Sequence, residues 1–267
     1  MNSLISIHSH GFHKTIAAPL YNTISGATPL IVYSFKSTNY NSINGTSGYY
    51  TNLANPGTDS FYVFNSLTSA STTSTFLFNY LNFSANGGTT YIASTTPKAS
   101  IGNNNTTYTN VLTCITSSTS FTAFTLTYWI NVNGGGAAIW DRWGGTPYTH
   151  DYQIYIQKGY CENAGVGIGG SLTNITGTTW YFNAFTLNGT TLSWWYCAVG
   201  STFPSTANAT GGTTGVQGVN ANCNFVFGSS QWPDGNATFY LSDLRLYGSA
   251  LNQSDLNGMF TAGPNTN

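Results

Sequence analysis

Residues 239–260 read FYLSDLRLYGSALNQSDLNGMF, a strand-like stretch followed by a short helix signal. Successive residues of a strand face opposite sides of the sheet. One side then holds Leu244 and Leu246, and the other holds Leu241, Asp243, Arg245 and Tyr247. We expect the two leucines to face the core between two sheets. Asp243 and Arg245 then neighbour each other and can interact without entering that core, in a structural role that contributes about 0–1 kcal/mol if the pair is exposed.

A helix start follows this strand. Asn252 is a suitable N-cap residue, and Asp255 stands three residues later, at the capping-box position. Leu256 and Phe260, four residues apart, give the next turns one apolar side. The stretch therefore predicts a closing strand and a short helix with a structural role.

Most of the remaining chain shows the pattern of strands separated by turns. The 267 residues are 40% hydrophobic, 15% aromatic and only 5% charged. β-branched and aromatic residues favour strands, and their spacing with Gly, Asn or Pro between them is typical of a sandwich or barrel. A polar loop is expected over 37–52. The predicted strands are 30–36, 60–66, 74–83, 89–94, 110–116, 121–132, 137–143, 152–158, 180–187, 191–199, 223–228 and 238–247.

The clearest local signal is FTLNGTTL, residues 185–192. Asn188-Gly189 suits the centre of a type I′ turn, which needs positive φ at both central residues. We predict a hairpin between 180–187 and 190–199. The second strand is apolar on both faces, so we expect it to be covered on both sides, with its tryptophans in the core.

Five blocks in order resemble a laminin-G-like domain of the concanavalin A-like lectin/glucanase superfamily. They are LIVYSF (30–35), FLFNYLNFSANGGTTYIAS (76–94), FTLTYWINV (124–132), TTWYFNAFTLNGTTLSWWYCAVG (178–200) and the opening stretch. The resemblance implies an all-β fold, a two-sheet antiparallel jelly-roll β-sandwich with a short C-terminal helix. Its expected organisation is an arm over residues 1–28, the sandwich over 29–262 and a tail over 263–267. The family includes lectins, hydrolases, adhesion modules and virion proteins, so the fold does not imply one function.

The charge pattern argues against nucleic acid as a partner. Six Lys and Arg residues are spread along the chain and form no basic patch, and the net charge is −1. The apolar runs are shorter than the roughly 18 residues needed to span a membrane. The stretch MNSLISIHSHGFHK lacks the features of a secretory signal, so a signal is not predicted.

The acids do not fit glycoside hydrolysis. Glucanases of the superfamily carry a pattern similar to E-x-D-x-x-E, which places their carboxylates on one face of a strand. This chain has a single glutamate, Glu162. The seven acids supply no pair at strand spacing, so we predict that the protein is not an enzyme. The four cysteines include no C-x-x-C pair, and buried free thiols are slightly favoured over disulfides.

Two loop regions rich in aromatic and polar residues are candidate ligand sites, for a glycan or for an interface. The candidates are Trp140, Asp141, Arg142, Trp143, Tyr148, His150, Trp232 and Asp234. Packing at the ends of the sandwich is the alternative role for these side chains. No cofactor is expected, although Asp141, Asp151 and Asp234 form a weak candidate Ca²⁺ site.

The sequence thus predicts a non-catalytic structural or adhesion sandwich, a surface or minor capsid component of a virion. Its partners would be other protein chains of an assembly, packed through residues 1–28. The alternative is a secreted or cell-surface carbohydrate-binding module, and a glycoside hydrolase is a distant third. The expected location is the virion or the extracellular surface.

Overall fold

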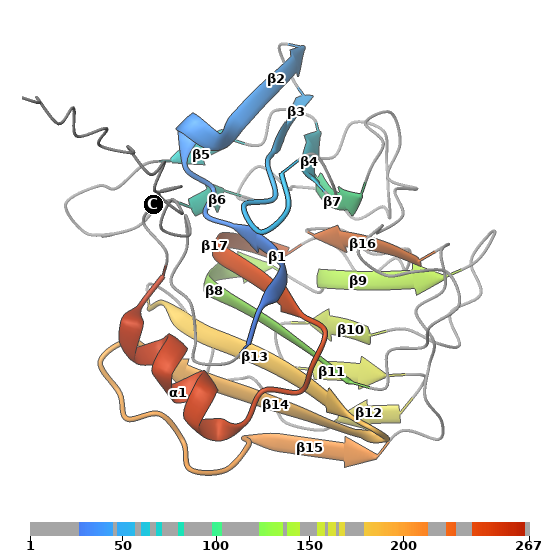
Figure 1. Ribbon diagram of the computed structural model, residues 1–267, viewed down its shortest axis with the longest axis vertical. Coiled ribbons are helices and arrows are strands. Elements are labelled where there is room, and N and C mark those ends of the chain that lie inside the picture. Colours follow the sequence, from blue (N-terminus) through green and yellow to red (C-terminus); the bar gives the residue numbers. More distant parts are fainter. Residues whose placement is uncertain are drawn as a thin grey trace, which may run out of the picture.

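The computed structural model describes the parts of the chain that form two β-sheets and one helix (Figure 1). The described residues are 27–44, 47–56, 60–64, 68–70, 80–82, 98–102, 123–135, 138–144, 154–157, 160–163, 166–168, 179–212, 223–227 and 237–264. Among them, no helix is long and apolar enough to cross a membrane.

The first sheet has eight strands. Seven of them follow the order β15-β14-β13-β8-β17-β6-β5, and the eighth, β1, also pairs with β17. Its strands are β1 (Pro29–Tyr33), β5 (Thr68–Ala70), β6 (Tyr80–Asn82), β8 (Ala123–Gly135), β13 (Tyr181–Asn188), β14 (Thr191–Ala198), β15 (Ala209–Gly212) and β17 (Ala237–Tyr247). The helix α1 (Gln253–Ala262) follows β17 directly.

The second sheet has nine strands in the order β12-β11-β10-β9-β16-β7-β4-β3-β2. Its strands are β2 (Tyr40–Asn44), β3 (Ser47–Tyr50), β4 (Ser60–Phe64), β7 (Lys98–Gly102), β9 (Ala138–Gly144), β10 (Ile154–Gln157), β11 (Tyr160–Asn163), β12 (Val166–Ile168) and β16 (Cys223–Phe227). A short 3-10 helix, η1 (Ser37–Asn39), lies between β1 and β2. The pairings in both sheets are antiparallel, for example β9 with β16 and β8 with β17.

The main core lies between the two sheets. Phe61 and Tyr50 enter it from the nine-stranded sheet, and Tyr128, Phe185 and Trp194 enter it from the eight-stranded sheet. The rings of Phe185 and Trp194 stack at a centroid distance of 5.3 Å. Aromatic side chains bury large areas, so this layer supplies the main hydrophobic stabilisation of the sandwich.

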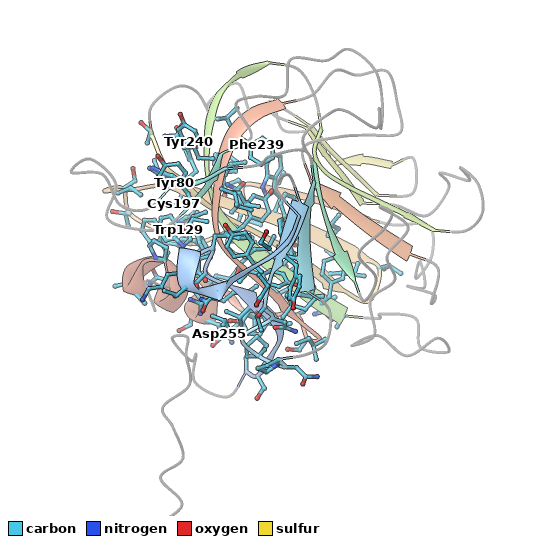
Figure 2. The ribbon with its side chains drawn as sticks, turned by 90° about the horizontal axis from the view of Figure 1, so that it is seen from above. Tyr80, Trp129, Cys197, Phe239, Tyr240 and Asp255 are labelled. Carbon is cyan, nitrogen blue, oxygen red and sulfur yellow. The ribbon has the colours of Figure 1, made fainter. Side chains whose placement is uncertain are left out.

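A second apolar cluster covers the other face of the eight-stranded sheet. Leu256 and Met259 of α1 pack there with Phe182 of β13. Phe260 of α1 stacks on Trp129 of β8 at 5.8 Å. Figure 2 shows Trp129, with Tyr80, Tyr240 and Cys197, on this face and Phe239 on the core face. The eight-stranded sheet is therefore covered on both sides.

The predicted all-β sandwich with a short C-terminal helix is confirmed. The capping box is also confirmed: the Asn252 side chain accepts a hydrogen bond from the Asp255 backbone N–H, and the Asp255 carboxylate accepts one from the Asn252 backbone N–H. Leu192 and Trp194 lie in the main core, and Cys197 lies in the second cluster, so β14 is covered on both faces as expected.

The predicted hairpin is confirmed, but its turn type is wrong. Asn188 pairs with Thr191, so the two loop residues are Gly189 and Thr190. Gly189 has φ +60°, and the described residues with positive φ include neither Asn188 nor Thr190. A positive φ at the first central residue alone is typical of a type II′ turn, which requires glycine at that position.

The predicted polar loop over 37–52 is wrong. It contains η1 and the antiparallel pair β2 and β3, in which Tyr40 stands opposite Tyr50. These strands lie at one end of the nine-stranded sheet, where polar residues such as Asn41 are exposed, so their sequence lacks a continuous apolar pattern. The predicted strands 89–94 and 110–116 lie outside the described residues, as do 1–26 and 265–267, and the domain boundaries stay predictions.

The predicted face of Leu241 is wrong, because Leu241 lies in the main core with Leu244 and Leu246. The predicted interaction of Asp243 with Arg245 is confirmed, and the pair is buried. The cause is a β-bulge: the register of β17 on β8 shifts between Ser242 and Arg245. Asp243 has φ +41°, a conformation in which an extra residue inserts into a strand and reverses the alternation beyond it.

Candidate functional site

Four of the predicted ligand residues lie in strand β9, and the others lie outside the described residues. Trp140, Asp141, Arg142 and Trp143 lie in β9, in the interior of the nine-stranded sheet, rather than in a turn. The candidates outside the described residues are Tyr148, His150, Asp151, Trp232 and Asp234. The structure therefore fixes the backbone position of half of the ligand candidates and leaves the site as a prediction.

A continuous cross-strand row runs through Asp141 across the whole nine-stranded sheet. Asp141 stands opposite Val226 of β16 on one side and Tyr155 of β10 on the other. Tyr155 in turn stands opposite Glu162 of β11. We call the complete set the outward row; from β2 to β12 it comprises Asn41, Tyr49, Tyr62, Ser100, Val226, Asp141, Tyr155, Glu162 and Gly167.

The outward row lies on the face of the sheet that points away from the main core. Directly opposed residues share a face, and successive residues of a strand alternate between faces. The next row contains Tyr50 and Phe61, which are buried in the core between the sheets. At the β2 end of the outward row, Asn41 is exposed and Tyr49 is half-buried. Asp141 and Glu162 are therefore positions of the outward row.

The same register separates the four candidates on β9. Arg142 stands opposite Phe225, in the row of Tyr50 and Phe61. Trp143 follows Asp141 by two residues and stands opposite Asn224. Alternation therefore assigns Asp141 and Trp143 to the outward face, and Trp140 and Arg142 to the core face.

Glu162 is a site residue that the sequence pattern did not reveal. Neighbouring strands lie about 4.8 Å apart, so the backbones of Asp141 and Glu162, two strands apart, are separated by about 10 Å. Their sequence separation of 21 residues gives no sign of this, because only the pairing of β9, β10 and β11 brings them into one row. The register thus places one tyrosine position between two acid positions on neighbouring strands.

The two acids whose side chains the structure describes have structural roles. Asp243 accepts two hydrogen bonds from Arg245, from Nε at 2.9 Å and from an Nη atom at 2.7 Å. Burial of Arg245 opposes its charged form, but the Asp243 carboxylate and Tyr247 outweigh this and hold its pKa above the ordinary value. Asp255 completes the capping box of α1. Both carboxylates thus make hydrogen bonds within the fold.

The described part of the chain contains no group of three or more His, Cys, Asp or Glu residues that could hold a metal ion. The candidate Ca²⁺ site stays a prediction, because only Asp141 of its three aspartates lies in a described element. Cys197 is a buried free thiol, in agreement with the favoured prediction, and burial raises its pKa.

A buried aromatic cluster on the eight-stranded sheet is the other place where polar and aromatic side chains meet. The rings of Tyr80, Trp180 and Tyr240 contact one another at centroid distances from 4.9 to 6.4 Å. Asn131 stands opposite Tyr240 and is 1% exposed, and its amide makes no side-chain hydrogen bond to any described residue. The rings pack against each other beside this amide, so the cluster belongs to the interior of the fold.

Comparison with known proteins supports the fold. No protein-family model and no curated protein sequence matches the chain. Among solved structures, the binding domain of botulinum neurotoxin DC in complex with rat synaptotagmin II is similar, with a TM-score of 0.55 and 14% identity over 88% of this chain and 52% of that one. The same neurotoxin domain in complex with SialylT has a TM-score of 0.50, 13% identity and coverages of 88% and 51%.

Trypanosoma rangeli sialidase with bound 2,3-difluoro-KDN is also similar, with a TM-score of 0.51 and 15% identity over 86% of this chain and 32% of that one. The chain thus spans about half the length of the neurotoxin domains and a third of the sialidase. At these identities the similarity concerns the fold alone. The similarity is consistent with a lectin-like β-sandwich. None of these structures is named as a laminin-G domain, so the laminin-G resemblance stays a prediction.

Proposed function

We propose that this protein is a non-catalytic binding or adhesion module that holds a glycan on the outer face of the nine-stranded sheet. The observation that carries the proposal is the outward row, which aligns Asp141, Tyr155 and Glu162 on three neighbouring strands. Sugar recognition combines an aromatic ring face with a few hydrogen-bonding groups that fix the hydroxyls. Trp143, two residues from Asp141 on β9, adds an aromatic position to the same face.

The structural neighbours support a binding role in general terms. They include a toxin binding domain in complex with rat synaptotagmin II, the same domain in complex with SialylT, and a sialidase in complex with 2,3-difluoro-KDN. Because this chain corresponds to only part of each neighbour, their ligands are not transferred to it. A protein receptor is therefore the competing ligand class for the same face.

The proposal is tested by glycan-array binding of the wild type and of single variants. We expect Tyr155→Ala and Trp143→Ala each to lower affinity for a bound glycan at least about tenfold, as loss of a central aromatic contact does. Tyr49→Ala is the matched control, because Tyr49 lies in the same row five strands from Tyr155, about 24 Å away. Equal losses in all three variants, or no glycan bound by the wild type, would contradict the proposal.

Hydrolysis is a second candidate because the outward row pairs two acids. Inverting glycosidases place their carboxyl groups about 6.5–9.5 Å apart, a range compatible with residues two strands apart. We propose binding without turnover, and an assay against β-glucans and other oligosaccharides tests it. Turnover by the wild type that disappears in Glu162→Gln would establish an enzyme instead.

The location and the assembly partners are part of the proposal. A virion or extracellular surface is supported by the low charge and by the abundance of hydroxyl and amide side chains. Packing of residues 1–28 against other chains of an assembly is part of the same proposal. Quantitative proteomics of purified particles tests both, with a fixed copy number per particle as the expected result and absence from particles as the contradicting one.

A further inference from the structure

The chain contains two exposed Leu-Asn-Gly segments whose backbones differ. Asparagine followed by glycine occurs five times, beginning at Asn44, Asn86, Asn133, Asn188 and Asn257. The structure describes the side-chain exposure of two of these pairs, Asn188-Gly189 and Asn257-Gly258, and both asparagines are exposed. Each of the two also follows a leucine, so their local sequences match and their different surroundings come from the fold.

Asn188-Gly189 lies at the end of the β13–β14 ladder. Asn188 forms the terminal pair of β13 with β14, opposite Thr191, and the terminal pair of β13 with β8, opposite Ala123. Terminal pairs open at a lower free-energy cost than pairs inside a sheet. Gly189 has φ +60°, and an added Cβ there would meet no atom within 4 Å. The backbone nitrogen of Gly189 is therefore sterically accessible to the Asn188 side chain.

Asn257-Gly258 lies inside α1. An α-helix engages each interior backbone N–H in a bond to the carbonyl four residues earlier. The residues on either side of the pair, Leu256 and Met259, are buried against the eight-stranded sheet, which opposes local opening of this turn. The Gly258 nitrogen is thus held in the helix, whereas the Gly189 nitrogen belongs to a loop.

We propose that Asn188 is a site of spontaneous deamidation and that α1 protects Asn257 from the same reaction. After the Gly189 N–H loses its proton to solvent, its nitrogen attacks Cγ of Asn188. A C–N bond forms and closes a succinimide ring, the Cγ–Nδ2 bond breaks, and Nδ2 leaves as ammonia after taking up a proton. Water then opens the ring to aspartate or isoaspartate. The net reaction consumes water, releases ammonia and requires no oxidant or reductant.

The products change the tip of the hairpin. Either one adds a carboxylate to a chain whose net charge is −1. Isoaspartate also lengthens the main chain by one methylene group, so the pair with Thr191 cannot form in its present register. The next pair, Leu187 with Leu192, is buried in the main core, and we expect the loosening to stop there.

The test is incubation of the full chain in mildly alkaline buffer, followed by proteolytic digestion and mass spectrometry of the two peptides. The mass gain from replacing NH2 by OH measures deamidation, and enzymatic methylation of isoaspartyl groups detects the rearranged product. We expect Asn188 to react at least about tenfold faster than Asn257, which corresponds to a difference of about 1.4 kcal/mol in the cost of local opening. Asn188→Gln should abolish the reaction in its own peptide and leave the rate at Asn257 unchanged.

The same incubation in urea is the matched control, because unfolding removes the difference between loop and helix. The two pairs should then react within about twofold of each other. Equal rates at the two sites in the folded chain, or an Asn188 that reacts only in urea, would overturn the inference. A tenfold ratio that persists in urea would overturn it as well, because the sequence and not the fold would then set the rates.

Discussion

Asp243 and Arg245, two residues apart on β17, form a doubly hydrogen-bonded ion pair with exposures of only 3% and 2%. Their positions result from the bulge at Asp243, which shifts the register of β17 on β8. An ion pair taken out of water is costly to form and costlier to break on one side, because the remaining charge stays buried. The closing strand thus depends on both partners being present.

Removing one partner should strongly destabilise the fold. We expect Asp243→Asn, which tolerates the positive φ, to lower the free energy of unfolding by about 3–5 kcal/mol in urea denaturation. The double variant Asp243→Asn/Arg245→Met should recover part of this loss, because no unpaired charge is left inside. A single-variant loss below about 1 kcal/mol, the range of exposed pairs, would contradict the buried geometry.

The stability of the hairpin of β13 and β14 should be sensitive to substitution of Gly189 and insensitive to substitution of Asn188. Gly189 has φ +60°, and an added Cβ would meet no atom within 4 Å, so the cost of substitution is conformational. We expect Gly189→Ala to lower the free energy of unfolding by about 1 kcal/mol. Asn188→Ala is the control, since Asn188 is a paired strand residue, and an equal or larger effect there would favour the type I′ turn instead.

The N-cap of α1 should contribute measurably to stability. The Asn252 side chain accepts a 3.0 Å hydrogen bond from the Asp255 backbone N–H. We expect Asn252→Ala to cost about 1 kcal/mol in thermal or urea unfolding, and Asn252→Ser, which keeps an acceptor, to cost much less. Equal effects of the two substitutions would show that the cap contributes little.

The contact between α1 and the eight-stranded sheet should contribute more than its cap. Leu256 is fully buried in the second cluster, so Leu256→Ala removes buried methyl groups and leaves a cavity. We expect a loss of about 2–5 kcal/mol in the free energy of unfolding. Leu251→Ala, at the margin of the same cluster, provides a comparison with the same type of substitution. A loss of less than about 1 kcal/mol in the free energy of unfolding for Leu256→Ala would mean that α1 is not firmly packed.

Stability should fall in alkaline solution, partly through Tyr80. Burial, with a smaller contribution from the neighbouring Tyr240, raises the pKa of Tyr80 above its ordinary value of 10.0. A raised pKa in the folded state gives stability that is complete below the unfolded pKa and is lost as the pH rises through the folded one. We expect Tyr80→Phe to lose less stability than the wild type between pH 9 and pH 11 in urea titrations. Parallel curves for the two proteins would contradict this.

The local features of this protein were predictable because they depend on a few neighbouring residues. Alternation and β-branched or aromatic content identified strands such as β8, β13, β14 and β17. The Asn-Gly pair identified a hairpin, and Asn252 with Asp255 identified the helix start. Short polar strands such as β2 and β3 were missed, because their residues satisfy the sheet by backbone pairing and carry no apolar pattern.

The sequence by itself therefore determined an all-β sandwich closed by a capped helix, and a chain without the strand-spaced acids of a glucanase. The tertiary structure alone decided which residues meet. The bulge at Asp243 reversed the alternation of β17 and buried its ion pair, and the pairing of β9, β10 and β11 aligned Asp141, Tyr155 and Glu162. Strand register is a long-range property, set by packing between segments far apart in the chain, and period-two alternation within one strand does not encode it.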